Sequence, residues 1–325
     1  MEQFFNSIWF DIIMDIIMLV VGFVLLIKGA DFFVDGSSSI AKKFRIPSIV
    51  IGLTVVSLGT SLPELASSVT ASLAGSNEIA ISNVVGSNLF TLMVVVGFCA
   101  LMANVSVDNN MLKRDIPISI GAAVLLCVLC AIGSTLGRID SALLLVLFVS
   151  YIALLVVYAM KNRTDDDEED DVKERNIILS LVFVIGGIVA IKFGGDFVVN
   201  SARDIAVTFG MSETLVGLTI VAVGTSLPEL VTSIVAARKN EVDLALGNAI
   251  GSNIFNILCI LGVTGVISPV KIIPNNLIDI GVVIAFSAII WLVAWKKRKL
   301  NRIDGVWMIL LYVAFAAYIV IRDMA

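Results

Sequence analysis

An internal duplication constrains this chain more than any other feature. Moved by 165 positions, the stretch GLTVVSLGTSLPEL at 52–65 meets GLTIVAVGTSLPEL at 217–230, with 11 of 14 residues identical. In the same frame SNVVGSNLFT at 82–91 meets GNAIGSNIFN at 247–256. The chain is therefore expected to contain two copies of one structural unit.

The composition places both copies in a membrane. Of the 325 residues, 58% are hydrophobic and 15% are charged, whereas about a quarter of the residues of a soluble protein are charged. A helix needs roughly 20 apolar residues to cross the bilayer core. By that measure ten spans are expected, near residues 12–34, 48–74, 79–103, 112–133, 140–160, 176–199, 214–237, 243–267, 277–295 and 305–321. The predicted fold class is an all-α polytopic membrane protein.

Five spans in each copy make the repeats inverted, because an odd number sends the second copy in from the opposite side of the membrane. The predicted organisation is a first repeat over 1–160, an acidic loop over 161–175 and a second repeat over 176–325. Inverted repeats typically hold substrate sites at the midplane and support alternating access. This architecture favours a transporter over a channel.

The basic residues predict the orientation. Sixteen of the 22 lysines and arginines fall in the loops that follow odd-numbered spans, and such residues are enriched on the cytoplasmic side. Both termini are then expected outside. The loop over 161–175, which contains the acidic run 165–171, is expected in the cytoplasm as a solvated linker; a regulatory cation contact is the alternative.

Several classes of function are disfavoured. The chain has no histidine, its four cysteines lie in apolar runs, and its formal charge is −5. A zinc or copper centre, a disulfide framework and nucleic-acid binding are therefore not expected. No H-E-x-x-H motif or convincing nucleophile and base supports an enzyme. No cofactor is expected, and the oligomeric state stays open.

Glu64 and Glu229 carry the functional signal, since each lies within an apolar span. A carboxylate there is costly unless it faces protein, water or a cation. Pro63 and Pro228 should break the helix and free carbonyl groups just before each Glu. The surrounding oxygen atoms suit a hard cation such as Ca²⁺ or Na⁺; they come from the hydroxyls of Thr60, Ser61, Thr225 and Ser226 and from carbonyls near Ser57 and Ala222.

The second motif of each copy, N-x-x-G-S-N, holds Asn83, Ser87, Asn248 and Ser252. Small residues allow close helix packing, and polar ones can bridge helices. The alternative role is that Ser87 and Ser252 complete a cation shell. Both roles are compatible.

The paired G-T-S-L-P-E and G-N-x-x-G-S-N blocks resemble the two repeats of the sodium/calcium exchanger family, prokaryotic type, within the calcium:cation antiporters. The resemblance covers all ten expected spans. It implies Ca²⁺ and Na⁺ as transported ions, the lipid bilayer of a prokaryotic inner membrane as location, and sliding of spans one and six against the others. It also implies that Glu64 and Glu229 are the central ligands.

Two positions depart from the family pattern. One helical turn after the motif serines, well-known exchangers of the family carry Asn in one half and Asp in the other, whereas this chain has Thr91 and Asn256. These two residues, together with Asn83 and Asn248 of the second motif, are expected to tune ion coupling. Sodium-coupled Ca²⁺ antiport is the leading hypothesis; an antiporter coupled to protons or another cation is the nearest alternative, and a cation channel is less favoured.

Overall fold

In the computed structural model, residues 2–75, 77–162, 175–211 and 222–324 are described, and helices account for most of them. The first half contains α1 (Glu2–Phe44), α2 (Ser48–Ile51), η1 (Gly52–Val56), α3 (Ser57–Thr60), α4 (Leu62–Leu73), α5 (Asn77–Phe90), η2 (Thr91–Val95), α6 (Val96–Met102), η3 (Met111–Asp115), α7 (Ile116–Gly133) and α8 (Arg138–Lys161). The second half contains α9 (Ile177–Thr208), α11 (Ala222–Gly224), α12 (Leu227–Arg238), α13 (Val242–Phe255), η5 (Asn256–Ile260), α14 (Leu261–Ile267), α15 (Pro274–Lys297) and α16 (Arg302–Met324). Elements labelled η are π-helical.

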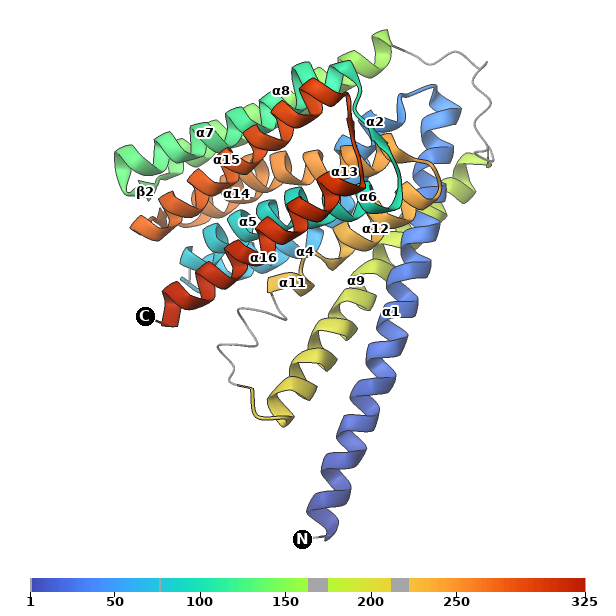
Figure 1. The fold of residues 1–325 in the computed structure, drawn as a ribbon, viewed down its shortest axis with the longest axis vertical. Helices are drawn as coiled ribbons and strands as arrows, with labels where there is room; N and C mark the ends of the chain where they lie inside the picture. The colour runs from blue at the N-terminus through green and yellow to red at the C-terminus, as the bar shows by residue number, and fades with distance from the viewer. Residues whose placement is uncertain (1, 76, 163–174, 212–221, 325) are drawn as a thin grey trace.

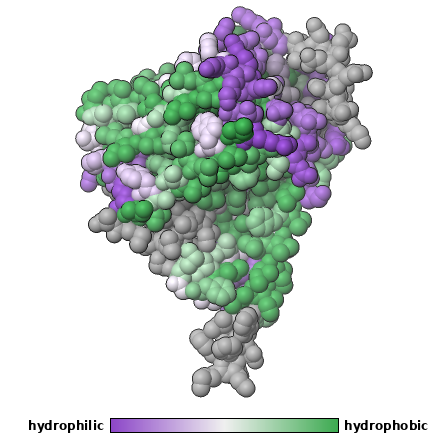
Figure 2. Space-filling model, viewed as in Figure 1, coloured by the Kyte–Doolittle hydropathy of each residue, from purple (hydrophilic) through white to green (hydrophobic). Residues whose placement is uncertain are grey.

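Most of the expected spans are helices of membrane-crossing length. Among the described residues, eight helices are long and apolar enough to span a bilayer, and α2–α3 with α4 form a further span bent by 47°. The expected span 214–237 lies partly outside the described residues. Hydrophobic side chains cover most of the face drawn in Figure 2, and hydrophilic ones gather near the top of that view. The chain is therefore a multi-pass membrane protein.

The ends of two expected spans were wrong. The span expected over 12–34 runs over Phe10–Phe44, and that expected over 176–199 runs over Ile177–Thr208. Lys42 and Lys43 consequently lie in the last turn of α1 and not in a loop. Apolar length marks where a helix meets hydrocarbon, but the helix itself continues as long as its backbone and its packing allow.

The two N-x-x-G-S-N spans form the centre of the bundle. About four-fifths of the apolar window is buried for Ile79–Met102 (83%) and Val242–Ile267 (78%), against 33% or less in the other long spans. Helices that are buried on every side can carry polar residues only where those residues find partners or ligands. The polar motifs are thus held in the interior and shielded from lipid.

Two short strand pairs correct the all-helical prediction. β1 (Val105–Ser106) pairs antiparallel with β4 (Lys299–Leu300), and β2 (Thr135–Leu136) pairs antiparallel with β3 (Val270–Lys271). No hydrophobic pattern predicts strand pairs of two residues. They lie in the connections between spans, where they satisfy backbone hydrogen-bonding groups. Each ladder joins a loop of the first half to a loop of the second.

Helices α1 and α9 lie side by side and extend away from the remaining helices, with the N-terminus at the far end (Figure 1). Glycines allow their backbones to touch: a Cβ added at Gly22 would lie 2.9 Å from the Gly194 carbonyl oxygen, and one at Gly187 would lie 2.8 Å from that of Gly29. Contact this close along the helices makes α1 and α9 one packed unit, which we call the α1–α9 pair.

Candidate cation site

Each Glu of the duplicated motif lies just after a helix break. α3 ends at Thr60 and α4 begins at Leu62, while in the second copy α11 ends at Gly224 and α12 begins at Leu227. Proline fits the first turn of the second helix, where its missing N–H is not needed. Glu64 and Glu229 fall in those first turns, where the positive end of the helix dipole stabilises a carboxylate.

The two copies exchange hydrogen bonds at this break. Ser61 Oγ donates to Glu229 Oε1 across 2.8 Å, and Ser226 Oγ donates to Glu64 Oε1 across 3.4 Å. Ser61 and Ser226 are equivalent in the 165-residue frame, as are the two glutamates. The expected ligands of both halves are therefore brought together in one cluster.

Both carboxylates are fully buried and only half satisfied. Glu64 and Glu229 are 0% exposed, and the second oxygen, Oε2, of each has no hydrogen-bond partner among the described residues. A buried carboxylate without compensation is strongly unfavourable. The cluster therefore offers two open acceptor atoms that a cation would satisfy.

The motif serines close the cluster. Ser252 Oγ lies 3.1 Å from Ser61 Oγ, and Ser87 Oγ lies 3.1 Å from Ser226 Oγ. Both serines belong to the buried central helices. Each serine therefore lies beside the hydroxyl group that bonds a glutamate and bridges two helices, as the packing role requires. Their place in a cation shell stays a prediction.

Thr91 and Asn256 open the π-helical segments η2 and η5. Asn256 Nδ2 donates to Asn88 Oδ1 across 3.0 Å and to Ser87 Oγ across 3.2 Å. Asn256 is thereby connected through Ser87 to the glutamate cluster. Thr91 Oγ1 and Asn256 Oδ1 are buried and have no partner among the described residues. π-Helical turns occur often at functional sites, and these two present further oxygen atoms near the cluster.

Asn248 is fixed by a serine that the sequence reasoning missed. Asn248 Nδ2 donates to Ser233 Oγ across 2.8 Å, and its Oδ1 accepts from Thr60 Oγ1 across 3.0 Å. The first copy repeats the serine contact, since Asn83 Nδ2 donates to Ser68 Oγ across 3.1 Å. Ser68 and Ser233 are equivalent in the duplication, four residues after each Glu, and that recurrence was the available signal.

The contacts of the described residues do not test three other predicted ligands, the Ser57 carbonyl, Thr225 and the Ala222 carbonyl. Ser57 Oγ bonds to its own helix at the Leu53 carbonyl, 2.9 Å away, and the Ser57 carbonyl oxygen already accepts the Ser61 N–H at 3.1 Å. Thr225 lies at the break after α11 and is half-buried, and the side chain of Ala222 is outside the described residues. Their roles as ligands stay predictions.

Glycines of the second motif allow α13 to approach η1 and α3 of the first copy closely. A Cβ added at Gly251 would lie 2.7 Å from Ser57 Oγ and 2.8 Å from the Leu53 Cα. A Cβ at Gly247 would lie 2.9 Å from the Gly52 Cα. This close approach places Ser252, the next residue, against Ser61.

The family model described as sodium/calcium exchanger protein matches residues 14–157 and again residues 179–321. The chain belongs to the sodium/calcium exchanger family. A putative antiporter, CaxA, from Alkalimonas amylolytica is 38% identical over 93% of this chain and 96% of its own length. The sodium/calcium exchanger MaX1 from Methanosarcina acetivorans is 36% identical over 94% and 98%.

Solved structures of the sodium-calcium exchanger NCX_Mj share the fold of this exchanger. One of them, soaked without Na⁺ and Ca²⁺, matches with a TM-score of 0.83 and 32% identity over 95% of this chain and 99% of its own. The match supports a transporter and not an enzyme. It also agrees with the family resemblance that the duplicated motifs predicted.

Proposed function

We propose that this exchanger moves Ca²⁺ against Na⁺ through a single site between its two copies. The reciprocal Ser61–Glu229 and Ser226–Glu64 hydrogen bonds carry the proposal, because they hold two buried carboxylates in one cluster with an open oxygen on each. Two carboxylates balance one Ca²⁺ or two Na⁺. Ions that balance the same charge at the same atoms compete, and this competition is what antiport requires.

The chemistry of the cluster suits hard cations. Its polar atoms are carboxylate, hydroxyl and amide oxygens and amide nitrogens. Ca²⁺ takes six to eight oxygen ligands in flexible geometry. Glu64 and Glu229 are the proposed central ligands; the other proposed ligands are Thr60, Ser61, Thr225, Ser226, Ser87, Ser252 and the carbonyls of Ser57 and Ala222.

We propose ten spans arranged as two inverted repeats around this site. The strand ladders support the arrangement, since the 165-residue frame carries β1 onto β3 and brings β2 to within one residue of β4, so that each ladder lies close to the equivalent of the other. The glycine contacts of the α1–α9 pair are related in the same way, as Gly22 and Gly29 correspond to Gly187 and Gly194. Both termini are proposed to lie outside.

Alternating access would follow from movement of the α1–α9 pair. Phe33 of α1 touches the helix break, because a Cβ added at Gly59 would lie 2.7 Å from the Phe33 ring and 3.0 Å from Ile188 of α9. Gly59 immediately precedes Thr60 and Ser61. A shift of the pair is thereby transmitted to the ligand cluster, opening it first to one side and then to the other.

Transport in liposomes tests the proposal. Liposomes that contain the purified protein and are loaded with Na⁺ should take up ⁴⁵Ca²⁺ from a Na⁺-free medium. Liposomes loaded with choline should not. Uptake driven by a pH gradient alone would instead favour proton coupling. Uptake that proceeds equally without any counter-gradient would favour a channel and contradict antiport.

A further inference from the structure

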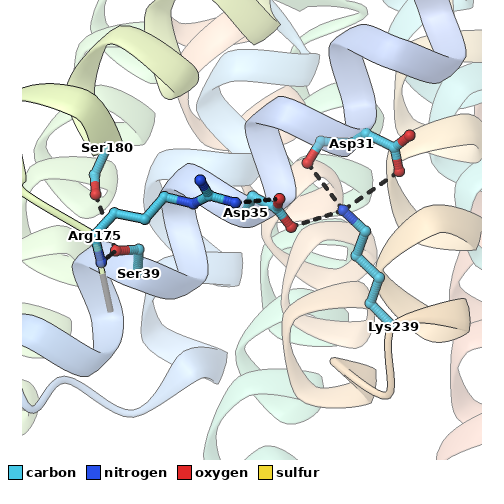
Figure 3. Close-up of polar contacts among 6 residues, drawn as sticks. All are labelled: Asp31, Asp35, Ser39, Arg175, Ser180 and Lys239. Atoms are coloured by element: carbon cyan, nitrogen blue, oxygen red, sulfur yellow. Dashed lines mark hydrogen bonds and ion pairs between the residues drawn. The ribbon is translucent and has the colours of Figure 1, made fainter. Parts of the chain in front are cut away.

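A cluster of charges joins the α1–α9 pair to the rest of the bundle. Lys239, directly after α12, places its Nζ 2.7 Å from Asp35 Oδ1, 3.3 Å from Asp31 Oδ1 and 3.1 Å from the Asp31 carbonyl oxygen (Figure 3). Arg175, just before α9, places Nη2 3.1 Å from Asp35 Oδ2. We call Asp31, Asp35, Arg175 and Lys239 the charge clasp.

The charge clasp is built at one end of the molecule. In the 165-residue frame Lys239 corresponds to Ala74, Arg175 to Phe10 and Asp35 to Asn200. The equivalent of Asp31 is Asp196, which pairs with Lys192 of its own helix across 2.6 Å. Those equivalent positions therefore cannot tie the α1–α9 pair to the bundle at the opposite end.

Nearby hydroxyl contacts are equally one-sided. Ser180 Oγ lies 2.9 Å from Ser39 Oγ, which also accepts the Arg175 N–H at 2.9 Å (Figure 3). Their equivalents at the other end are Asp15 and Asp204, two carboxylates that would repel each other at that distance. These contacts join α1 to α9 within the pair, at the same end at which Lys239 joins the pair to α12.

One-sided contacts matter in a transporter made of inverted repeats. With identical repeats, the two access states would be related by the two-fold axis between the repeats and would have equal free energy, so only residues that differ between the copies can favour one state. Lys239, Asp31 and Asp35 have side chains about one-third exposed (31%, 33% and 34%). Solvent therefore screens the charge clasp only in part. The clasp contributes more to the free energy of this conformation than a fully exposed ion pair would.

We propose that the charge clasp sets the balance between the two access states by holding the α1–α9 pair against the C-terminal end of α12. In this position the gap between α1 and α12 is closed at the end that the basic residues place in the cytoplasm. Sliding of the pair requires Lys239 to leave both aspartates. This inference rests on the alternating access proposed above.

Ser38 provides a reporter for the clasped face. It follows Asp31 by seven residues and Asp35 by three, so the three side chains share one face of α1, and it is only 5% exposed. A Ser38→Cys variant is made in a protein in which the four native cysteines are replaced. The rate of its reaction with a membrane-impermeant maleimide is measured in inside-out vesicles in choline buffer. The reaction should be slow while the clasp is intact.

Lys239→Gln should accelerate the labelling about fivefold, the population change that corresponds to about 1 kcal/mol. Lys239→Arg keeps the charge and should retain slow labelling. Lys192→Gln is the matched control, since it breaks an ion pair within a single helix, and it should have no effect. Asp35→Asn tests the clasp from the other side and should also accelerate labelling.

Unchanged labelling in both Lys239→Gln and Asp35→Asn would overturn the clasp, as would an equal increase in Lys192→Gln. The assay needs no transported ion. Faster labelling in a protein that fails the Na⁺ and Ca²⁺ liposome test would therefore support the clasp while rejecting the proposed ions, and the reverse pattern would reject the clasp alone.

Discussion

Ser61 of the first copy donates to Glu229 of the second across 2.8 Å. The inverse relation holds between Ser226 and Glu64 at 3.4 Å, so each copy provides the hydroxyl group that orients the carboxylate of the other. Neither copy completes the cluster by itself. Damage to the break in one copy is therefore expected to reach the ligand of the other.

Replacing Glu64 or Glu229 by Gln should each weaken Ca²⁺ binding by far more than tenfold, or 1.4 kcal/mol. The change removes one charge with little change in volume, and both carboxylates are completely buried. Isothermal titration calorimetry on folded protein measures the effect. Asp243→Asn, which neutralises an exposed carboxylate at the start of α13, should retain the affinity of the parent. A Gln variant with near-normal affinity would remove that residue from the site.

Ser61→Ala should weaken Ca²⁺ binding by about tenfold or more, because a hydrogen bond to a charged group contributes about 1.5–3 kcal/mol. The loss arises at Glu229, because Ser61 Oγ donates to its Oε1 in the parent and an alanine cannot. Ser67→Ala, on the exposed face of α4, is the matched control. Equal affinities for the two variants would show that Ser61 does not support the ligand.

Asn256→Asp should change the dependence of transport on Na⁺ or pH and leave Ca²⁺ transport itself intact. Asn256 donates to Ser87 Oγ and to the side-chain oxygen Oδ1 of Asn88 through Nδ2. An aspartate at this position would place an acceptor, in place of that donor, against Asn88 Oδ1. A proton or a cation would have to lie between them. Exchange is measured against pH and Na⁺ beside Asn162→Asp, an exposed change at the end of α8. Curves that superimpose on the parent would place Asn256 outside the ion shell.

Gly251→Ala should destabilise the protein by about 1–3 kcal/mol, the usual cost of overpacking. The added Cβ would lie 2.8 Å from the Leu53 backbone, which cannot rotate away as a side chain can. The melting temperature in detergent, monitored by size-exclusion chromatography after heating, measures the loss of stability. Gly281→Ala is the control because a Cβ there meets nothing within 4 Å. If both variants melt with the parent, the contact between α13 and η1 is not tight.

Sequence reasoning could predict the spans and the paired glutamates because both depend on local signals. Bilayer thickness sets a length that apolar runs must reach, and a carboxylate in such a run is costly enough to indicate function. The duplication then placed Glu64 opposite Glu229 without any knowledge of packing. Family membership, which the same motifs predicted, was confirmed by the family model.

The remaining features depend on contacts between distant residues. Nothing local to Lys239 indicates that its ammonium group reaches Asp31 and Asp35, more than two hundred positions earlier in the sequence. The extension of α1 to Phe44 follows from its packing on other helices and not from apolar length. The carbonyl oxygen of Ser57, which was expected as a ligand, accepts the Ser61 N–H in the structure, and its role toward a cation stays a prediction.

The two strand ladders also bear on ancestry. β1 pairs with β4 and β2 pairs with β3, and the 165-residue frame carries β1 onto β3 and brings β2 to within one residue of β4. If the copies are inverted five-span repeats as proposed, then in an ancestor that encoded one such unit both ladders would be the same contact, made twice between two identical subunits inserted in opposite orientations. Gene fusion would then have turned an antiparallel homodimer into one chain, which freed each half to diverge and allowed a residue such as Lys239 to arise at one end alone.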